Sequence, residues 1–188
     1  EETAVNGRWV KGPGQELFKA VQAALGPIQV IAEDLGVITP EVDALRDALG
    51  FPGMRILQMA FGNDPKAAEY RPHNHIQRSV VYTATHDHNT SVGWFTSDPG
   101  TQSTQSREEI EAERRYVLDY LGTNGREIHW DLIRLALGSV AATAVFPLQD
   151  VLGLGTQARM NLPGSASGHW EWRVTFEQLT SGTLTRLR

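Results

Sequence analysis

Residues 79–89 read SVVYTATHDHN, and this stretch decides how the whole chain is interpreted. It begins with the β-forming residues Val80, Val81 and Tyr82. Polar side chains then occupy every position from 85 to 89. Burial of a strand does not require such an ending. The stretch therefore predicts a strand that carries a titratable cluster at its carboxyl end.

Strands and helices alternate in the rest of the chain. Apolar runs predict further strands at residues 28–32, 53–61 and 144–150. Helical periodicity and capping signals predict helices that begin after Gly14, at Thr39, at Ser106 and at about Glu127. This alternation is typical of βαβ units, so the sequence predicts an α/β fold with a parallel sheet.

Polar residues follow three of the four predicted strands directly. They are Glu33 and Asp34 after the first, residues 85–89 after the third, and Gln149 and Asp150 at the carboxyl end of the fourth. Barrel enzymes build their sites at the carboxyl ends of their strands. Open α/β sheets do the same at a switch point of strand order. The pattern favours half of an eight-stranded barrel over a small doubly wound sheet.

Composition excludes several classes of function. The 188 residues carry a net charge of −5, which argues against nucleic acid or an anionic membrane as the main partner. No apolar run approaches the ~20 residues that cross a bilayer. The absence of cysteine excludes disulfides and thiolate metal sites, and it fits a cytoplasmic protein.

The polar cluster allows three interpretations. His86 and His88 alternate, so both could point from a strand toward a metal ion. Asp87 could instead be the functional group, flanked by histidines that hydrogen-bond a ligand. The third interpretation is a polar loop without a function. For Glu33 and Asp34 the alternatives are an acid that caps the next turn and a general acid in a site.

Two other motifs have simple interpretations. GLGTQA at residues 153–158 imitates a dinucleotide-binding loop, but the residues around it favour a glycine-rich turn. HWEWR at residues 169–173 places Trp170 and Trp172 on one side of an extended chain. Because tryptophan is usually buried, we expect them to pack against the exterior of the fold rather than to form a sugar platform.

Four segments of the chain together resemble the 4-α-glucanotransferases of the amylomaltase family. The segments are NGRWVKGPG (6–14), IAEDLGVITPEVDALRDALGFPGMRILQMAF (31–61), VYTATHDHNTSVGWF (81–95) and FPLQDVLGLGTQARMNLPG (146–164). The resemblance implies a (β/α)8 TIM barrel of the α-amylase clan and a retaining mechanism on α-1,4-glucans. It also implies that residues 1–188 are the C-terminal part of the catalytic barrel, strands five to eight, with no separate second domain.

The resemblance assigns roles to individual residues. Glu33 corresponds to the general acid/base of the family's AEDLG segment, and Asp87 to the transition-state-stabilising aspartate of its THD segment. His86 and Asn161 correspond to substrate-binding residues. The family's nucleophilic aspartate lies in an R-I-D-H segment, which this sequence does not contain. The family usually reads THDND where this chain reads THDHN at residues 85–89.

The expected function is therefore transfer of a 1,4-α-D-glucan segment to the 4-hydroxyl of an acceptor glucose or glucan. The implied partners are α-1,4-glucans, maltooligosaccharides and the N-terminal remainder of the enzyme, with no cofactor and no metal. Because the nucleophile is missing, we expect the 188 residues alone to be inactive. The alternatives are a metal-dependent barrel hydrolase that uses His86 and His88, and a glucan-binding chain without catalysis.

Overall fold

The structure is a computed structural model, which describes residues 6–99 and 105–188. The chain forms two compact units, Glu1–Gly53 (the first unit) and Met54–Arg188 (the second unit), and each is described by itself. Among the described residues, no helix is long and apolar enough to cross a membrane.

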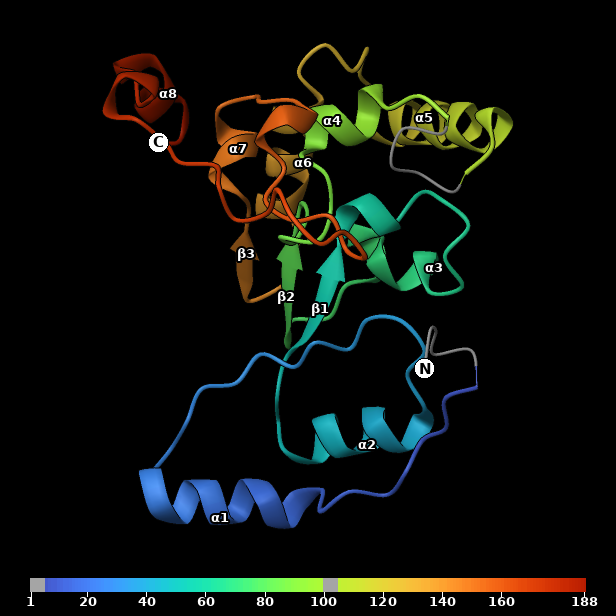
Figure 1. Cartoon of the computed structure of the whole chain (residues 1–188), viewed down its shortest axis with the longest axis vertical. Helices are drawn as coiled ribbons and strands as arrows, with labels where there is room; N and C mark the ends of the chain where they lie inside the picture. Colours follow the sequence, from blue (N-terminus) through green and yellow to red (C-terminus); the bar gives the residue numbers. More distant parts are fainter. Residues whose placement is uncertain (1–5, 100–104) are drawn as a thin grey trace. The chain divides into compact units, whose positions relative to one another are not determined.

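The first unit contains two helices, α1 (Gln15–Leu25) and α2 (Pro40–Ala48) (Figure 1). Gly26 ends α1 in a conformation with φ of 78°, and its amide donates to the carbonyl of Gln22. Thr39 precedes α2 in an extended conformation, and Pro40 occupies the first turn, where its missing N–H costs nothing. Both helices confirm the predictions from sequence.

The strand predicted at residues 28–32 is absent, so this prediction was wrong. The segment runs without regular secondary structure, and Ala32 donates its amide to the carbonyl of Pro52 at 2.9 Å. Proline has no N–H with which to return such a hydrogen bond, so a ladder cannot continue from this point. An apolar run is thus insufficient for a strand when its neighbour cannot pair.

A three-stranded sheet forms the centre of the second unit (Figure 1). Its strands are β1 (Gly53–Ile56), β2 (Ser79–Tyr82) and β3 (Thr143–Val145), in the order β1-β2-β3. Strands β2 and β3 are parallel, with Val80 opposite Thr143 and Tyr82 opposite Val145. This confirms the predicted α/β fold with a parallel sheet.

Strands β1 and β3 are shorter than predicted. The chain leaves β1 after Ile56 and forms the 3-10 helix η1 (Leu57–Met59), in which the amide of Gln58 donates to the carbonyl of Thr83 at 3.3 Å. Strand β3 ends before Pro147, which cannot donate to a ladder and instead precedes a helix. The loops at the carboxyl ends of the strands therefore begin earlier than hydrophobicity suggested.

Helices connect and follow the strands of the second unit. They are α3 (Ala67–Tyr70), α4 (Ser91–Thr96), α5 (Arg107–Leu121), α6 (Ile128–Leu137), α7 (Leu148–Val151) and α8 (Ser181–Arg186), with short 3-10 helices η2 (Pro72–Asn74), η3 (Thr156–Ala158) and η4 (Phe176–Gln178). The predicted capping box of Ser106 and Glu109 opens α5, and Gly122 ends it with φ of 64°. Helix α6 ends at Leu137, five residues before the predicted end at 142. Residues 153–158 form a turn and η3, as the glycine-rich turn predicted.

Packing fixes the helices that lie next to the carboxyl ends of the strands. Trp130 and Ile133 of α6 form a buried cluster with Val151 of α7, and Phe146 and Leu148 pack against it. Helices α4 and α7 follow directly beyond the arrowheads of β2 and β3 (Figure 1). The hydrophobic cluster thus supports the loops that follow the strands.

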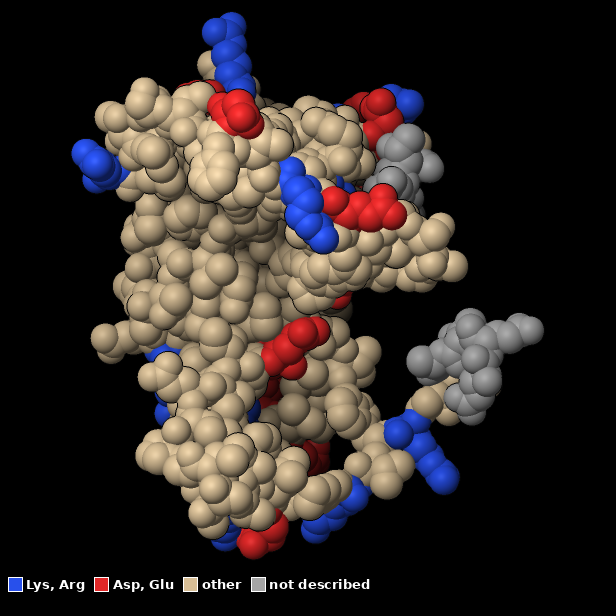
Figure 2. Space-filling view, turned by 60° about the vertical axis from the view of Figure 1, so that its left-hand side comes forward, with Lys and Arg blue, Asp and Glu red and all other residues tan. Residues whose placement is uncertain are grey.

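On the face drawn in Figure 2, the described acidic and basic side chains are scattered over a mostly uncharged surface.

Candidate active site

The loop after β2 is a tight turn whose side chains bond to one another. His88 donates its amide to the carbonyl of Thr85 at 3.1 Å, and the Thr85 hydroxyl lies 2.7 Å from Nδ1 of His88. The Thr85 amide also points at this nitrogen, at 3.4 Å. Because Nδ1 accepts hydrogen bonds, the proton of the neutral imidazole belongs on Nε2. The turn is therefore built on a neutral His88.

Burial lowers the pKa of His88 below its ordinary value, and the nearby positive charge of Arg159 lowers it further, against the opposing effect of Asp87. His86 lies on the exposed side of the same turn. Among the described residues, no three His, Asp or Glu side chains are grouped so that they could hold a metal ion. The described residues therefore do not supply the further ligands that a metal pair of His86 and His88 needs.

Asp87 is held by a segment that lies more than 70 residues further along the chain. The side-chain amide of Asn161 donates to Oδ1 of Asp87 at 2.5 Å. Arg159 donates from Nη2 to the Asp87 carbonyl at 2.7 Å and from Nε to the Asn161 carbonyl at 2.8 Å. Asn161, which was predicted to bind substrate, thus contacts the predicted catalytic carboxylate. Arg159 was not predicted to be a site residue, although it lies in the segment 146–164 that resembles the amylomaltase family.

His86 lies between Asp87 and an aromatic side chain. Its Nε2 is 3.4 Å from Oδ1 of Asp87, and its ring centroid is 5.1 Å from that of Trp170, with 38° between the planes. Trp170 is 52% exposed, so the expectation that it packs against the exterior of the fold was wrong. Trp172, two residues later, is the more buried of the two. The alternation of Trp170 and Trp172 in the sequence suggested an extended chain with both side chains on one side. The chain turns at Trp170, so this inference gave the wrong role for its side chain.

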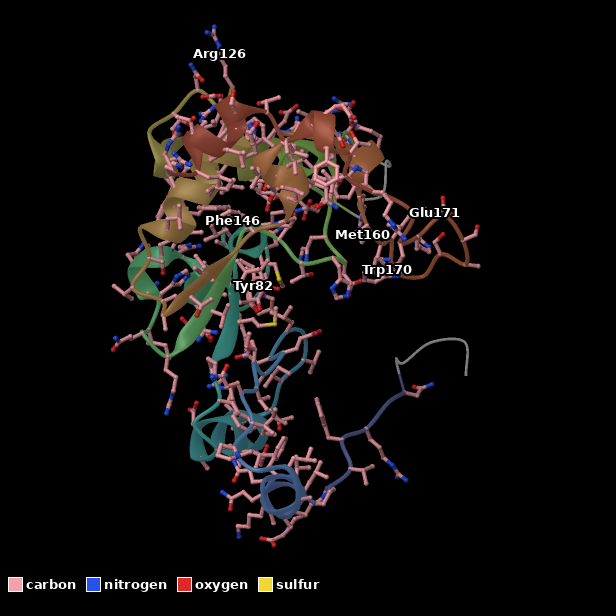
Figure 3. The ribbon with its side chains drawn as sticks, turned by 90° about the vertical axis from the view of Figure 1, so that its left-hand side faces the viewer. Tyr82, Arg126, Phe146, Met160, Trp170 and Glu171 are labelled. Carbon is pink, nitrogen blue, oxygen red and sulfur yellow. The ribbon has the colours of Figure 1, made fainter. Side chains whose placement is uncertain are left out.

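Trp170 is the one described non-glycine residue with a positive φ, at 62°. Such a conformation costs a bulky residue roughly 1–3 kcal/mol, and it persists only where surrounding contacts determine it. Its amide donates to the carbonyl of Met160 at 2.8 Å. In Figure 3, Met160 and Trp170 lie close together, whereas Glu171 points outward.

Several of these residues, His86, Met160 and Trp170 among them, line a pocket of about 180 Å³ in the second unit. The lining comes from the loop after β2, from the loop after β3 and from the segment that follows η3. The lining residues are Thr85, His86, His88, Asn89, Thr90, Pro147, Gln149, Arg159, Met160 and Trp170. The pocket therefore lies at the carboxyl ends of β2 and β3, where polar residues were predicted to gather.

Asp150 has a structural role at this end of the sheet. Its side chain is completely buried and accepts hydrogen bonds from the Thr83 hydroxyl at 2.6 Å and from the amide and the hydroxyl of Ser91, both at 2.7 Å. These contacts join the end of β2 and the start of α4 to α7. A buried carboxylate with three donors is satisfied within the protein. Asp150 thus holds Thr83 and Ser91, the residues on either side of the loop that carries Asp87.

The adjacent acids Glu33 and Asp34 have different environments in the first unit. Asp34 is only 5% exposed and forms an ion pair of 2.5 Å with Arg46 of α2. A Cβ atom at Gly53 would lie 2.2 Å from Oδ2 of Asp34, so a side chain there would displace the buried carboxylate. Glu33 is exposed. Asp34 therefore has the structural role, and the action of Glu33 together with Asp87 stays a prediction.

A sequence model of the 4-alpha-glucanotransferase family matches residues 1–180. The chain belongs to this family. The chain is 51% identical over 182 residues to the 4-alpha-glucanotransferase of Synechocystis sp., covering 95% of this chain and 34% of that protein. It is 47% identical over 191 residues to that of Thermus thermophilus, covering 99% and 36%.

The fold agrees with this assignment. The solved amylomaltase from Streptococcus agalactiae in complex with acarbose superimposes with a TM-score of 0.83 at 31% identity, covering 98% of this chain and 35% of that one. This glucanotransferase-family chain thus spans about a third of the length of the curated relatives it matches.

Two residues that depart from the usual THDND of the family have defined contacts. His88 is bonded to Thr85, as described above. The Asn89 side chain donates from Nδ2 to the hydroxyl of Thr156 at 3.0 Å, and the backbone carbonyl of Asn89 accepts from Nε2 of Gln58 at 2.9 Å. His88 and Asn89 therefore bond within the protein, and the contacts of Asn89 connect the turn to η1 and η3.

Proposed function

We propose that this chain is the C-terminal half of the catalytic (β/α)8 barrel of a 4-α-glucanotransferase. The whole protein transfers a 1,4-α-D-glucan segment to the 4-hydroxyl of an acceptor glucose or glucan. The observation that carries the proposal is the hydrogen bond from Asn161 to Asp87, beside His86, which lines the pocket. It joins two predicted site residues, next to a third, His86, in the loop at the carboxyl end of β2.

In this proposal, Glu33 is the general acid/base. Retention at a sugar carbon requires a nucleophilic carboxylate and an acid/base about 5–5.5 Å apart. Glu33 first protonates the departing sugar oxygen, and it later takes the proton of the incoming 4-hydroxyl. The nucleophile comes from outside the 188 residues, which contain no R-I-D-H segment.

The carboxylate of Asp87 stabilises the positive charge that develops on the glucosyl ring in the transition state. The Asn161 amide fixes the direction of one carboxylate oxygen, and Arg159 fixes the backbone of the same residue. His86 hydrogen-bonds a sugar hydroxyl from its half-exposed position. The acarbose carried by the Streptococcus agalactiae amylomaltase is in keeping with a sugar ligand for this site.

The substrates in this proposal are α-1,4-glucans and maltooligosaccharides, and the partner of this chain is the N-terminal remainder of the same enzyme. The 188 residues alone are expected to bind such sugars without turning them over. A metal-dependent hydrolase is the rival enzyme, and it needs ligands beyond His86 and His88.

The test uses the full-length protein and maltotriose. Transfer predicts glucose together with maltopentaose, with rates unchanged after treatment with a chelator. Production of glucose and maltose without longer products, together with stoichiometric zinc in the purified protein, would establish the hydrolase instead. Absence of any turnover by the full-length protein would overturn the proposed function.

A further inference from the structure

Trp170 occupies a backbone conformation for which glycine is the suited residue. Its φ of 62° lies in the left-handed region, as do those of Gly164 and Gly168 in the same loop, at 80° and 79°. Glycine adopts this region without steric cost, whereas a side chain at Cβ is strained there. A glycine at position 170 would satisfy the backbone equally well. The indole, and not the path of the chain, therefore accounts for tryptophan at this position.

Hydrogen bonds hold the strained backbone from both sides. The Trp170 amide donates to the Met160 carbonyl at 2.8 Å. The guanidinium of Arg173 donates from Nη1 to the carbonyl of Trp170 at 2.7 Å and to that of Trp172 at 2.8 Å. Because both polar backbone groups of Trp170 are paired, the conformation is determined by its surroundings and the direction of the indole is set.

The indole is directed to His86 and not to the interior. The ring centroids are 5.1 Å apart, and both side chains line the pocket. At 52% exposure, about half of Trp170 remains in contact with water. Trp172 is the more buried tryptophan of the segment, so it is the better candidate for an anchor to the core. A role in packing alone therefore does not explain Trp170.

We propose that Trp170 is a positioning residue, which holds the imidazole of His86 beside the carboxylate of Asp87. This inference rests on the proposed function, in which His86 and Asp87 belong to the glucan site. A half-exposed imidazole has rotational freedom that ligand binding must remove. Contact with the indole removes that freedom in advance, and Nε2 then remains 3.4 Å from Oδ1 of Asp87. Asn161 and Trp170 belong to the same segment of the chain. Asn161 holds Asp87, and Trp170 holds the adjacent His86.

The test compares Trp170→Gly, Trp170→Phe and Trp172→Phe in the full-length protein. Trp170→Gly relieves the backbone strain, so its Tm should stay within a few degrees of the wild-type value, while kcat/KM for maltotriose falls by about tenfold or more. Trp170→Phe keeps an aromatic ring against His86 and should retain most of the activity. Trp172→Phe is the matched control and should leave activity unchanged. Wild-type activity in Trp170→Gly would overturn the proposal.

A double mutant separates positioning from direct contact with the sugar. In a His86→Ala background, Trp170→Gly should reduce kcat/KM by less than about twofold, because the residue through which it acts is gone. A further loss of about tenfold in that background would mean that the indole acts independently of His86, which contradicts the proposal.

Nuclear magnetic resonance gives a readout that does not depend on turnover. With ¹³C-labelled histidine, the ring signal of His86, identified by its loss in His86→Ala, should be shifted upfield by the indole and should lose this shift in Trp170→Gly. An unshifted His86 signal in a wild-type protein that disproportionates maltotriose would overturn the positioning role alone. A shifted signal in a protein that does not turn over maltotriose would overturn the proposed function and leave the positioning of His86 standing.

Discussion

The side-chain amide of Asn161 donates a hydrogen bond of 2.5 Å to the carboxylate of Asp87, although 74 residues separate the two in sequence. Arg159, from the same segment, donates to the carbonyl of Asp87. The carboxylate and the backbone of Asp87 are therefore both oriented before a ligand arrives. Electrostatic stabilisation of a transition state requires such preorganised groups.

The first prediction concerns the charge of Asp87. In the full-length protein, Asp87→Asn should lower kcat on maltotriose by about a hundredfold or more and change KM little, because the charge acts mainly in the transition state. Steady-state kinetics measure both parameters. Asp119→Asn, which changes an exposed aspartate of α5, is the control. A raised KM with unchanged kcat would mean that Asp87 only holds substrate.

The second prediction concerns the donor that orients Asp87. Asn161→Asp replaces the donor by a second carboxylate at hydrogen-bond distance, and two such carboxylates cannot both ionise without repulsion. At neutral pH, kcat should fall by about tenfold or more, with partial recovery toward lower pH as the pair takes up a proton. Asn124→Asp keeps the side-chain oxygen that accepts from the Arg126 amide, so it serves as the control. A pH profile identical to that of the wild-type protein would contradict this orienting role.

The third prediction concerns stability against acid. Burial lowers the pKa of His88 and of His75, whose Nε2 donates to the Tyr70 carbonyl at 2.8 Å. A histidine whose pKa is lower in the folded state stabilises the protein fully above its unfolded-state pKa of about 6.5, and this contribution is lost as the pH falls. Tm should therefore decrease as the pH is lowered from neutral to about 5.

Substitution of His88 provides the check. The decrease of Tm with acid should be smaller in His88→Asn, because the buried titrating group is removed. His73→Asn changes an exposed histidine and should leave the dependence as it is in the wild-type protein. An unaltered dependence in His88→Asn would show that another group causes the loss of stability.

The fourth prediction concerns the buried carboxylate below the site. Asp150→Ala leaves the donors of Thr83 and Ser91 without their acceptor, so the free energy of unfolding should decrease by about 3 kcal/mol. Urea denaturation measures this change. Asp119→Ala, at an exposed position of α5, should change it by less than about 0.5 kcal/mol. A stable Asp150→Ala protein would show that the hydrogen bonds at the end of β2 are dispensable.

Sequence patterns predicted the elements whose causes are local. Helices α1, α2 and α5 begin and end at residues with capping or helix-breaking chemistry, such as Pro40, Ser106 and Gly122, and all three were predicted. The parallel pairing of β2 with β3 was also predicted, because it follows from the alternation of strands and helices. The gathering of polar groups after β2 and β3 follows from the direction of the strands.

The errors concern long-range contacts. Residues 28–32 have the hydrophobicity of a strand, but their partner at residue 52 is a proline. Hydrophobicity contains no information about such a partner. Likewise, neither the contact of Asn161 with Asp87 nor that of Trp170 with His86 leaves a local signal, because each joins residues more than 70 positions apart. The positive φ of Trp170 could not be expected from a residue type that rarely adopts it.

We propose that Glu33 is the acid/base and Asp87 the charge-stabilising carboxylate of a retaining glucanotransferase, whose nucleophile lies outside this chain. The most direct measurement is intact mass and peptide mapping of full-length Glu33→Gln after reaction with α-maltotriosyl fluoride. The fluoride leaves without acid assistance, so the first step proceeds, whereas the second step is slow without the base. We predict an accumulated glycosyl-enzyme whose labelled aspartate lies outside residues 1–188. A label on a residue within the chain, or rapid turnover of the fluoride with no adduct, would contradict the account.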